Sequence, residues 1–460
     1  MHIDSNQSRR AFLRRAAQLG AIGAAAPFLD TLGLIGEAAA QSSSDYKALV
    51  CVFLYGGNDN WNTMPPYDPT SYNAYRSARP NIAIPHASLG ATALSPANDL
   101  RGQKFALNPA LAPLMPAFRK GKLAPIFNIG TLIEPTSKSD YLKRAVRLPP
   151  KLFSHNDQQS YVQSFQVEGA DAGWGGRMGD LIQSSNGTAA MTCISLQGRS
   201  LWLSGQNVTP YAVSPGSVTE LIRGGTRLYS SAPAYDALRQ LMTFEQEGSW
   251  ISQEHAKVVN RSLQLSDSIT SALARIPESS LTTFKSTNSL SEQLKMVARL
   301  IAVGPSLGLR RQVFFTSLGG WDHHSALLRN HPGLLGNVGN ALSEFYAATE
   351  QLGVADQVTT FTASDFGRML VDNGDGSDHG WGSTQFAIGG AVPGGRIFGA
   401  PPEVGINGKD DFGGRLIPTT SFDQLAATLG LWFGLPESSL PMILPNLANF
   451  DTSSWDLGFV

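Results

Sequence analysis

The sequence predicts an α/β fold in which a doubly wound, mostly parallel sheet, of the kind seen in alkaline phosphatases, is flanked by helices. Near-continuous apolar runs at 48–55 and 312–317 are typical of strands buried on both faces of such a sheet. Stretches with helical periodicity, such as 334–352 and 420–433, alternate with these runs. This alternation favours one α/β domain over residues 41–460.

Length and composition narrow the class of protein. The chain has 460 residues, 42% of them hydrophobic, which is enough to bury a large core. Its 35 basic and 36 acidic residues give a net charge of −1, which argues against a nucleic-acid-binding face. Cys51 and Cys193 lie in separate apolar runs, so we expect two buried thiols and no disulfide framework.

Residues 1–40 are typical of an export signal. A twin-arginine pattern at 8–13 precedes a mildly apolar segment at 16–35, and small residues at 38–40 offer a cleavage site. The apolar segment is interrupted by polar residues and glycines, which makes it too weakly hydrophobic for a membrane span. We therefore expect a Tat signal peptide that is removed after export by the Tat translocase. The mature protein is expected in the periplasm or outside the cell, with no membrane span.

Polar residues follow the first two predicted strands. Strand 48–55 ends in two glycines, which permit a tight turn, and Asp59 follows them. Asp59 is placed either to cap a turn or to bind a metal at the end of the strand. Strand 123–129 leads through a polar loop to Ser154-His155-Asn156-Asp157 ahead of a helix, where the serine is either an N-cap or a hydroxyl at an anion-binding helix start.

The middle of the chain is mainly helical. Arg177 lies in a Gly-Trp-Gly-Gly-Arg helix entry, where it is able to meet an anion, and a strand is predicted at 192–196. Helical periodicity then appears at 234–246, 253–275 and 290–303. We interpret the region of about 200–305 as a helical and loop insert that either packs on the sheet or forms a cap over the site.

The strand at 312–317 delivers the strongest candidate ligands. It ends in two glycines and Trp321, and the next residues are Asp322, His323 and His324. If this tip is extended, alternate side chains point the same way, so Asp322 and His324 converge while His323 points aside. A converging carboxylate and imidazole suit Zn²⁺ or Mn²⁺. The alternative is a strand followed by an ordinary polar loop.

The strand at 357–362 carries a third acid. Asp365 and Arg368 follow it, and a Gly/Asp-rich loop over 373–382 holds His379. Taken alone, that loop is either a calcium-like turn or a solvated loop.

These strand ends together predict a metal site. In a parallel sheet the carboxyl ends of the strands share one edge, so Asp59, Asp322 and Asp365 are expected to meet there. With His324 and His379 they form a mixed oxygen and nitrogen site for one or two divalent ions, namely Zn, Mn, Mg or Ca.

Such an ion acidifies a bound water or a serine hydroxyl and offsets charge on a phosphoryl or sulfuryl oxygen. Arg368 and Arg177 are the predicted holders of that anion, through forked hydrogen bonds.

Seven motifs carry a resemblance to a known family. They occur in this order: Ser-Arg-Arg-Ala-Phe-Leu, Phe-Leu-Tyr-Gly-Gly-Asn-Asp-Asn-Trp-Asn, Ser-His-Asn-Asp, Gly-Trp-Gly-Gly-Arg, Gly-Gly-Trp-Asp-His-His, Ser-Asp-Phe-Gly-Arg and Asp-His-Gly-Trp-Gly. Together they resemble the Tat-exported domain-of-unknown-function family 1501, in the alkaline phosphatase and sulfatase superfamily. The resemblance implies a doubly wound sheet with a metal site at its edge.

The resemblance also implies roles for single residues. Ser154 would be the nucleophile and Asp59 the first-strand ligand. The remaining implied ligands are Asp322, His324, Asp365 and His379.

The sequence departs from the superfamily pattern at three places. The family has a small residue where this chain has His323, which leaves the choice between His323 and His324 open. Phe366 stands where the phosphatase pattern has a histidine ligand, so a sparser second metal site or a single ion is implied. Neither cysteine lies in a Cys-x-Pro-x-Arg context, which argues against a formylglycine mechanism.

Two functions compete at this point. The first is an exported metal-dependent hydrolase of phosphate or sulfate esters, on a small molecule or a polymer. The alternative is a non-catalytic periplasmic or surface protein that binds or assembles a partner and keeps a metal site for structure.

Overall fold

The computed structural model describes residues 46–218, 227–244 and 249–460. The export signal predicted over residues 1–40 lies outside these ranges. Within them, no helix combines the length and the apolar character that a membrane crossing needs.

Among the described residues, nine strands form a mostly parallel sheet at the centre of the molecule, in the order β11-β2-β8-β7-β1-β6-β3-β4-β5. Its middle strands are β7 (Val358–Ser364), β1 (Lys47–Tyr55) and β6 (Arg311–Gly319), and β1 pairs in parallel with both neighbours. The predicted mostly parallel α/β sheet is therefore confirmed. The carboxyl ends of the three strands lie side by side, since Tyr55 pairs with Gly319 and Leu54 with Ser364.

The remaining strands extend the sheet to both sides. Two of them run antiparallel to their neighbours: β8 against β7 and β2, and β5 against β4. The bounds of these strands are β2 (Leu123–Gly130), β3 (Cys193–Ser195), β4 (Tyr211–Ser214), β5 (Ser217–Val218), β8 (Ser383–Gly389) and β11 (Thr420–Ser421). A separate antiparallel pair consists of β9 (Asp411–Phe412) and β10 (Arg415–Leu416).

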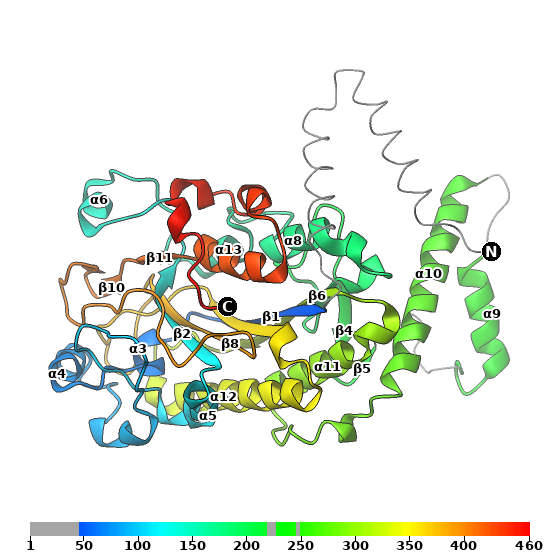
Figure 1. Cartoon of the computed structure of the whole chain (residues 1–460). Helices are drawn as coiled ribbons and strands as arrows, with labels where there is room; N and C mark the ends of the chain where they lie inside the picture. The colour runs from blue at the N-terminus through cyan, green and yellow to red at the C-terminus, as the bar shows by residue number, and fades with distance from the viewer. Residues whose placement is uncertain (1–45, 219–226, 245–248) are drawn as a thin grey trace, which may run out of the picture.

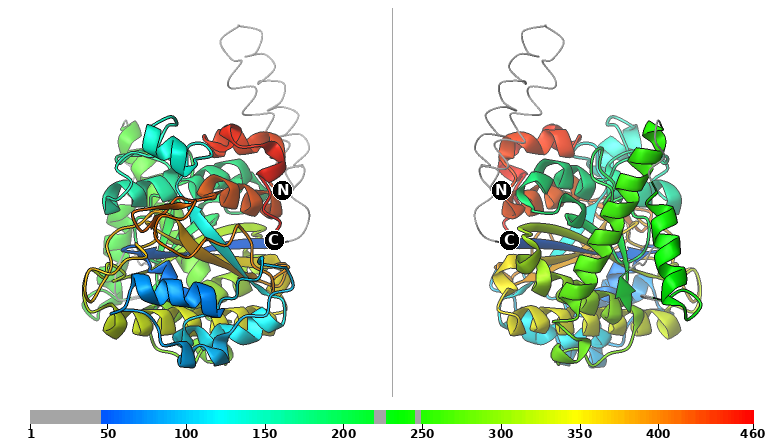
Figure 2. Two further views of the ribbon diagram at one scale, coloured as in Figure 1. Left: turned by 90° about the vertical axis from the view of Figure 1, so that its left-hand side faces the viewer. Right: turned by 90° about the vertical axis from the view of Figure 1, so that its right-hand side faces the viewer.

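Helices cover both faces of the sheet (Figures 1 and 2). On one face lie α5 (Met115–Arg119), α11 (Ser289–Val303) and α12 (Leu327–Gln351), and on the other α8 (Trp174–Ile182) and α13 (Phe422–Phe433). The residues of β1 alternate between the two resulting cores: Val50 and Val52 belong to one, Leu49 and Cys51 to the other. Both faces of the central strand are thus buried, as its continuous apolar sequence predicts.

Side-chain caps and close backbone contacts define several helix ends. Ser421 and Gln424 form a capping box at the start of α13, and Gly434 ends that helix with φ of +100°. Asn288 caps α11 through the Ser291 amide. At the start of α8, a Cβ on Gly176 would lie 2.1 Å from the Ser204 carbonyl oxygen, so only glycine allows this approach.

The predicted insert contains α9 (Ala232–Met242), α10 (Trp250–Leu273) and α11. Of these, α11 packs beneath the sheet, whereas α9 and α10 stand at the opposite end of the molecule from α3 (Asn60–Thr63), which follows β1 (Figures 1 and 2). These two helices therefore do not cover the carboxyl end of β1. Shorter helices complete the fold: α4 (Pro69–Ala78), α6 (Lys138–Lys143), α7 (His155–Ser164) and α14 (Leu440–Ile443).

Candidate metal centre

Side chains from three distant segments meet beyond the carboxyl ends of β6 and β7. Asp322 lies three residues past β6, His379 lies in the loop between β7 and β8, and His155 is the first residue of α7. Their ligand atoms all lie within 4.8 Å of one another, a group able to hold a metal ion. The fold therefore brings residues more than 150 positions apart to one point, at the edge where the strand pattern predicts a site.

Three imidazole rings surround the Asp322 carboxylate. The Nε2 atoms of His324 and His379 lie 3.1 Å and 3.3 Å from its Oδ1, and Nε2 of His155 lies 3.4 Å from its Oδ2. The Nε2 atoms of His324 and His379 are only 2.8 Å apart. The predicted convergence of Asp322 and His324 is thus observed.

In each of the three rings, Nδ1 lies within hydrogen-bond distance of an oxygen atom outside the cluster. Nδ1 of His155 lies 2.7 Å from Asp365 Oδ2, and Nδ1 of His379 lies 2.7 Å from the Phe153 carbonyl oxygen. Nδ1 of His324 lies 3.1 Å from Asp378 Oδ1. Carbonyl and ionised carboxylate oxygens only accept, so each ring donates Nδ1–H, and its neutral form presents the Nε2 lone pair to Asp322.

This donor set fits a divalent cation. Nε2 of His155 is buried and has no hydrogen-bond partner among the described residues. The Nε2 atoms of His324 and His379 lie 2.8 Å apart, close enough for both to face one cation. One cation bound between the rings would accept the lone pairs of all three Nε2 atoms. Histidines that bind a metal normally donate the N–H of the other ring nitrogen to a carboxylate or a backbone carbonyl, as the Nδ1 atoms do here. Three imidazoles and one carboxylate suit Zn²⁺ or Mn²⁺.

Electrostatics keep the carboxylate ionised and one ring neutral. Partial burial works to raise the pKa of Asp322, but the hydrogen bond and charge of Arg368, with the nearby histidines, lower it to about 2. Burial lowers the pKa of His379. The hydrogen bond to Asp365 raises the pKa of His155. Near neutral pH the Asp322 carboxylate and the His379 ring are thus in the forms that bind metals.

Asp365 supports the cluster from behind. Its buried carboxylate accepts from Nδ1 of His155, from the Gln159 amide at 2.8 Å, and from the Gly56 backbone N–H at 3.2 Å. Gly56 adopts φ of +121°, and a Cβ there would lie 2.6 Å from the Asp322 backbone nitrogen. Glycine at this turn therefore lets the end of β1 approach both Asp365 and the 320–324 loop.

The two arginines predicted to bind an anion donate mainly to backbone carbonyl oxygens in this structure. The Arg368 guanidinium is fully buried and donates to the carbonyl oxygens of Gly56, Gly57 and Ser377 and to Asp322. Arg177 donates to three backbone carbonyl oxygens, and burial lowers its pKa to about 10. Arg368 contacts the candidate centre through Asp322, and each of its three nitrogen atoms donates to at least one oxygen.

The structure places Asp59 in a different setting from the other predicted ligands. Its carboxylate forms a fully buried ion pair with Arg79 at 2.8 Å. Arg79 also donates to the side chain of Asn62 and to backbone carbonyls. A fixed guanidinium already neutralises this carboxylate, and among the described residues Asp59 makes no contact with Asp322 or its histidines. Its expected role as the first-strand ligand is therefore not supported by its contacts.

Ser154, the predicted nucleophile, adjoins the cluster. It is the N-cap residue of α7, directly before His155, and its hydroxyl donates to Asp157 Oδ2 at 2.7 Å. The expected capping bond from the serine is absent. Phe366 lies beside the rings of His155 and His379, with centroids 4.8 Å and 4.6 Å away. The apolar ring of Phe366 thus lies beside two of the candidate metal ligands.

Sequence reasoning missed His155 as a candidate ligand and left the choice between His323 and His324 open. His323 is buried and packs edge-on against His331 at 5.6 Å, away from the cluster. Of the two histidines, His324 is the one whose Nε2 lies 3.1 Å from Asp322, as strand alternation favours. His155 stands in the Ser-His-Asn-Asp motif. In the sequence, that motif drew attention to Ser154 rather than to His155, because serine is a common N-cap residue.

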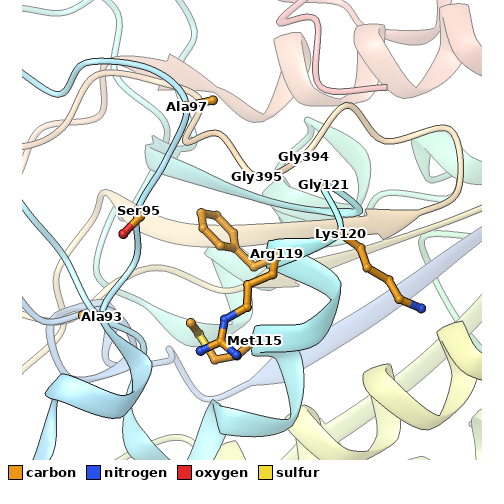
Figure 3. Close-up of a pocket in the computed structure, with 10 residues that line it drawn as sticks. Ala93, Ser95, Ala97, Met115, Arg119, Lys120, Gly121, Gly394 and Gly395 are labelled. Atoms are coloured by element: carbon orange, nitrogen blue, oxygen red, sulfur yellow. The ribbon is translucent and has the colours of Figure 1, made fainter.

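A cavity of about 590 Å³ lies apart from this centre (Figure 3). Its lining includes Ser95, Met115, Arg119 and Lys120, but no histidine, carboxylate or cysteine. Lys120 points away from Arg119 in Figure 3 and pairs with Glu350 at 3.3 Å. The chemistry of the lining does not indicate a metal or hydrolytic site there.

The fold and the site define an α/β protein with a His/Asp/His group, able to hold a metal ion, at the edge of its sheet. The chain belongs to the family described as Protein of unknown function (DUF1501), which matches residues 46–435. This confirms the family resemblance in the sequence. A comparison with curated proteins gives no match.

Among solved structures, the chain is similar to Ps i-CgsB. The crystal structure of Ps i-CgsB in complex with k-i-k-neocarrahexaose has a TM-score of 0.34 and 9% sequence identity, over 88% of this chain and 77% of that chain. The crystal structure of Ps i-CgsB has a TM-score of 0.35 and 11% identity, over the same shares of the two chains.

Proposed function

We propose that the protein is a metal-dependent hydrolase of phosphate or sulfate esters. The observation that supports this proposal is the orientation of three imidazole rings. In each ring, Nδ1 lies beside an oxygen acceptor and Nε2 faces Asp322. His155, Asp322, His324 and His379 would hold one divalent ion, with Zn²⁺ or Mn²⁺ best suited to this donor set. Such an ion supplies Lewis-acid polarisation of an ester oxygen and lowers the pKa of bound water.

The residues of the chain would prepare this chemistry in distinct ways. Arg368 keeps the Asp322 carboxylate ionised and fixed in position. Asp365 sets the tautomer of His155, because its carboxylate accepts the Nδ1 proton. Ser154 is the candidate nucleophile, and Asp157 orients its hydroxyl. A water molecule is the alternative nucleophile, and the two are separated by the Ser154→Ala variant.

The site is open to solvent. The side chains of Asp322 and His324 are 46% and 45% exposed. An open site admits an ester group on a large molecule as readily as on a small one, so both polymer and small-molecule esters fit the proposal. The twin-arginine pattern in the sequence supports action outside the cytoplasm, in the periplasm or beyond.

The proposal is tested first by elemental analysis of protein purified without added metal. Metal-loaded protein is then assayed on a panel of aryl phosphates and aryl sulfates, with Asp322→Ala as the inactive control. We expect turnover by the wild type, none by the variant, and the same circular dichroism for both. If metal-loaded wild type turns over no ester across the panel, the metal is structural and the binding or assembly function replaces hydrolysis.

A further inference from the structure

A groove of about 530 Å³ adjoins the candidate metal centre. Asp322 lines this groove and is also part of the metal-binding group. The other walls come from the 320–325 loop and from the first two turns of α12, which contribute Arg329 and Asn330. A phosphate or sulfate group held in this groove would therefore have both Asp322 and Arg329 in its walls.

Arg329 is the free cation of this groove. It is exposed, and its guanidinium has no hydrogen bond or ion pair with any residue that the structure describes. In this it differs from Arg368 and Arg177, whose N–H groups are bonded to backbone carbonyls. The groove thus has an available guanidinium, whose planar fork matches the oxygens of phosphate and sulfate.

The backbone that carries Arg329 is held in place. The Ala326 N–H donates to the Asp375 carboxylate at 3.0 Å, and the Leu327 N–H donates to the Asp375 carbonyl oxygen at 2.9 Å. His323, 4% exposed, forms part of the groove wall, and its Nδ1 has no hydrogen-bond partner. The groove therefore offers one free cation on a fixed helix start and one buried unpaired nitrogen in its wall.

We propose that Arg329 binds the anionic oxygens of the substrate's phosphate or sulfate group. This inference rests on the proposed function, since it assigns the binding of the ester's anionic group to Arg329, whose guanidinium makes no hydrogen bond with the described residues, rather than to Arg368 or Arg177. Asp322 and Asp378 are both negative near this point, so without a metal they repel an anion. Anion binding therefore requires the metal and Arg329 together.

The test measures binding of inorganic phosphate and inorganic sulfate to zinc-loaded protein by isothermal titration calorimetry at low ionic strength. The variant is Arg329→Gln. The matched control is Arg275→Gln, because Arg275 is also exposed and lines a different cavity, of about 350 Å³. We expect the Kd for the bound anion to rise about tenfold in Arg329→Gln and to stay unchanged in Arg275→Gln. Bound zinc, measured by elemental analysis, should be equal in all three proteins.

Comparison of the two anions identifies the ester class, since the tighter one marks phosphate or sulfate as the preferred group. The inference is overturned if zinc-loaded wild type binds neither anion, if Arg329→Gln binds them as tightly as wild type, or if metal-free protein binds them equally well. Its failure is distinguishable from failure of the proposed function. Metal-dependent anion binding through Arg329 without turnover of any ester would refute hydrolysis and leave the anion site standing.

Discussion

The orientation of His155 by Asp365 gives the sharpest prediction about the metal centre. In Asp365→Asn, the amide oxygen can take the place of Oδ2 and still accept from His155, from Gln159 and from the Gly56 N–H at 3.2 Å. The amide NH₂ then takes the place of Oδ1, 3.3 Å from the Gly56 nitrogen, where it can no longer accept. The opposite orientation places NH₂ against both side-chain donors. The first orientation is therefore favoured, and the hydrogen bond to His155 loses its charge.

The expected size of the effect follows from the buried position of Asp365. Replacing a charged acceptor with a neutral one weakens a buried hydrogen bond by about 1 kcal/mol. Loss of such an outer partner lowers metal affinity by about tenfold to a hundredfold. The side chain of Asp365 is 0% exposed, so water cannot replace the lost charge.

The assay is a zinc titration against a competing chromophoric chelator. Asp378→Asn is the matched control, because this carboxylate holds His324 in the same way but is 51% exposed. Water can substitute there, so we expect less than about a fivefold change. Zinc affinity in Asp365→Asn equal to that of wild type would refute the idea that Asp365 prepares His155 as a ligand.

Four further predictions test the site and its framework. Asp322→Asn should lose metal binding and ester turnover while keeping its circular dichroism; full metal content would exclude Asp322 as a ligand. Arg177→Met should lower the free energy of unfolding in urea by about 2–4 kcal/mol, because three backbone carbonyls lose their donor, with KM unchanged. If this variant instead shows a raised KM and an unchanged free energy of unfolding, Arg177 binds the anionic group of the substrate. Gly176→Ala should cost about 3 kcal/mol or more, since the new Cβ would lie 2.1 Å from the Ser204 carbonyl oxygen; wild-type stability would contradict this close packing. Burial raises the pKa of Asp423 to about 7, so its native state binds more protons than the unfolded state between pH 3.8 and about 7. The free energy of unfolding contributed by Asp423 should therefore fall as the pH rises through that window, and the fall should be smaller in Asp423→Asn. The same dependence of the urea midpoint on pH in the wild type and the variant would contradict this.

The helix α12 shows how a local signal obscured part of the site. Sequence periodicity predicts a helix over 334–352, whereas α12 begins at Leu327 and contains Pro332. Proline lacks a backbone N–H and clashes with the preceding turn, so a helix is expected to start after it. The Asp375 loop holds the first turn in place through Ala326 and Leu327, and that turn carries Arg329. Only a tertiary contact supplied the reason for the earlier start.

The sequence by itself determined the sheet, its buried central strands and the convergence of Asp322 with His324. These follow from local rules, because apolar runs make buried strands and alternate residues of an extended tip share a side. The tertiary structure alone decided which charged groups are free. Arg79 neutralises Asp59, backbone carbonyls occupy Arg368 and Arg177, and an acceptor 210 residues away orients His155. The physical reason is that the state of a charged or polar group depends on the partners that folding brings to it, and their distance in sequence carries no local signal.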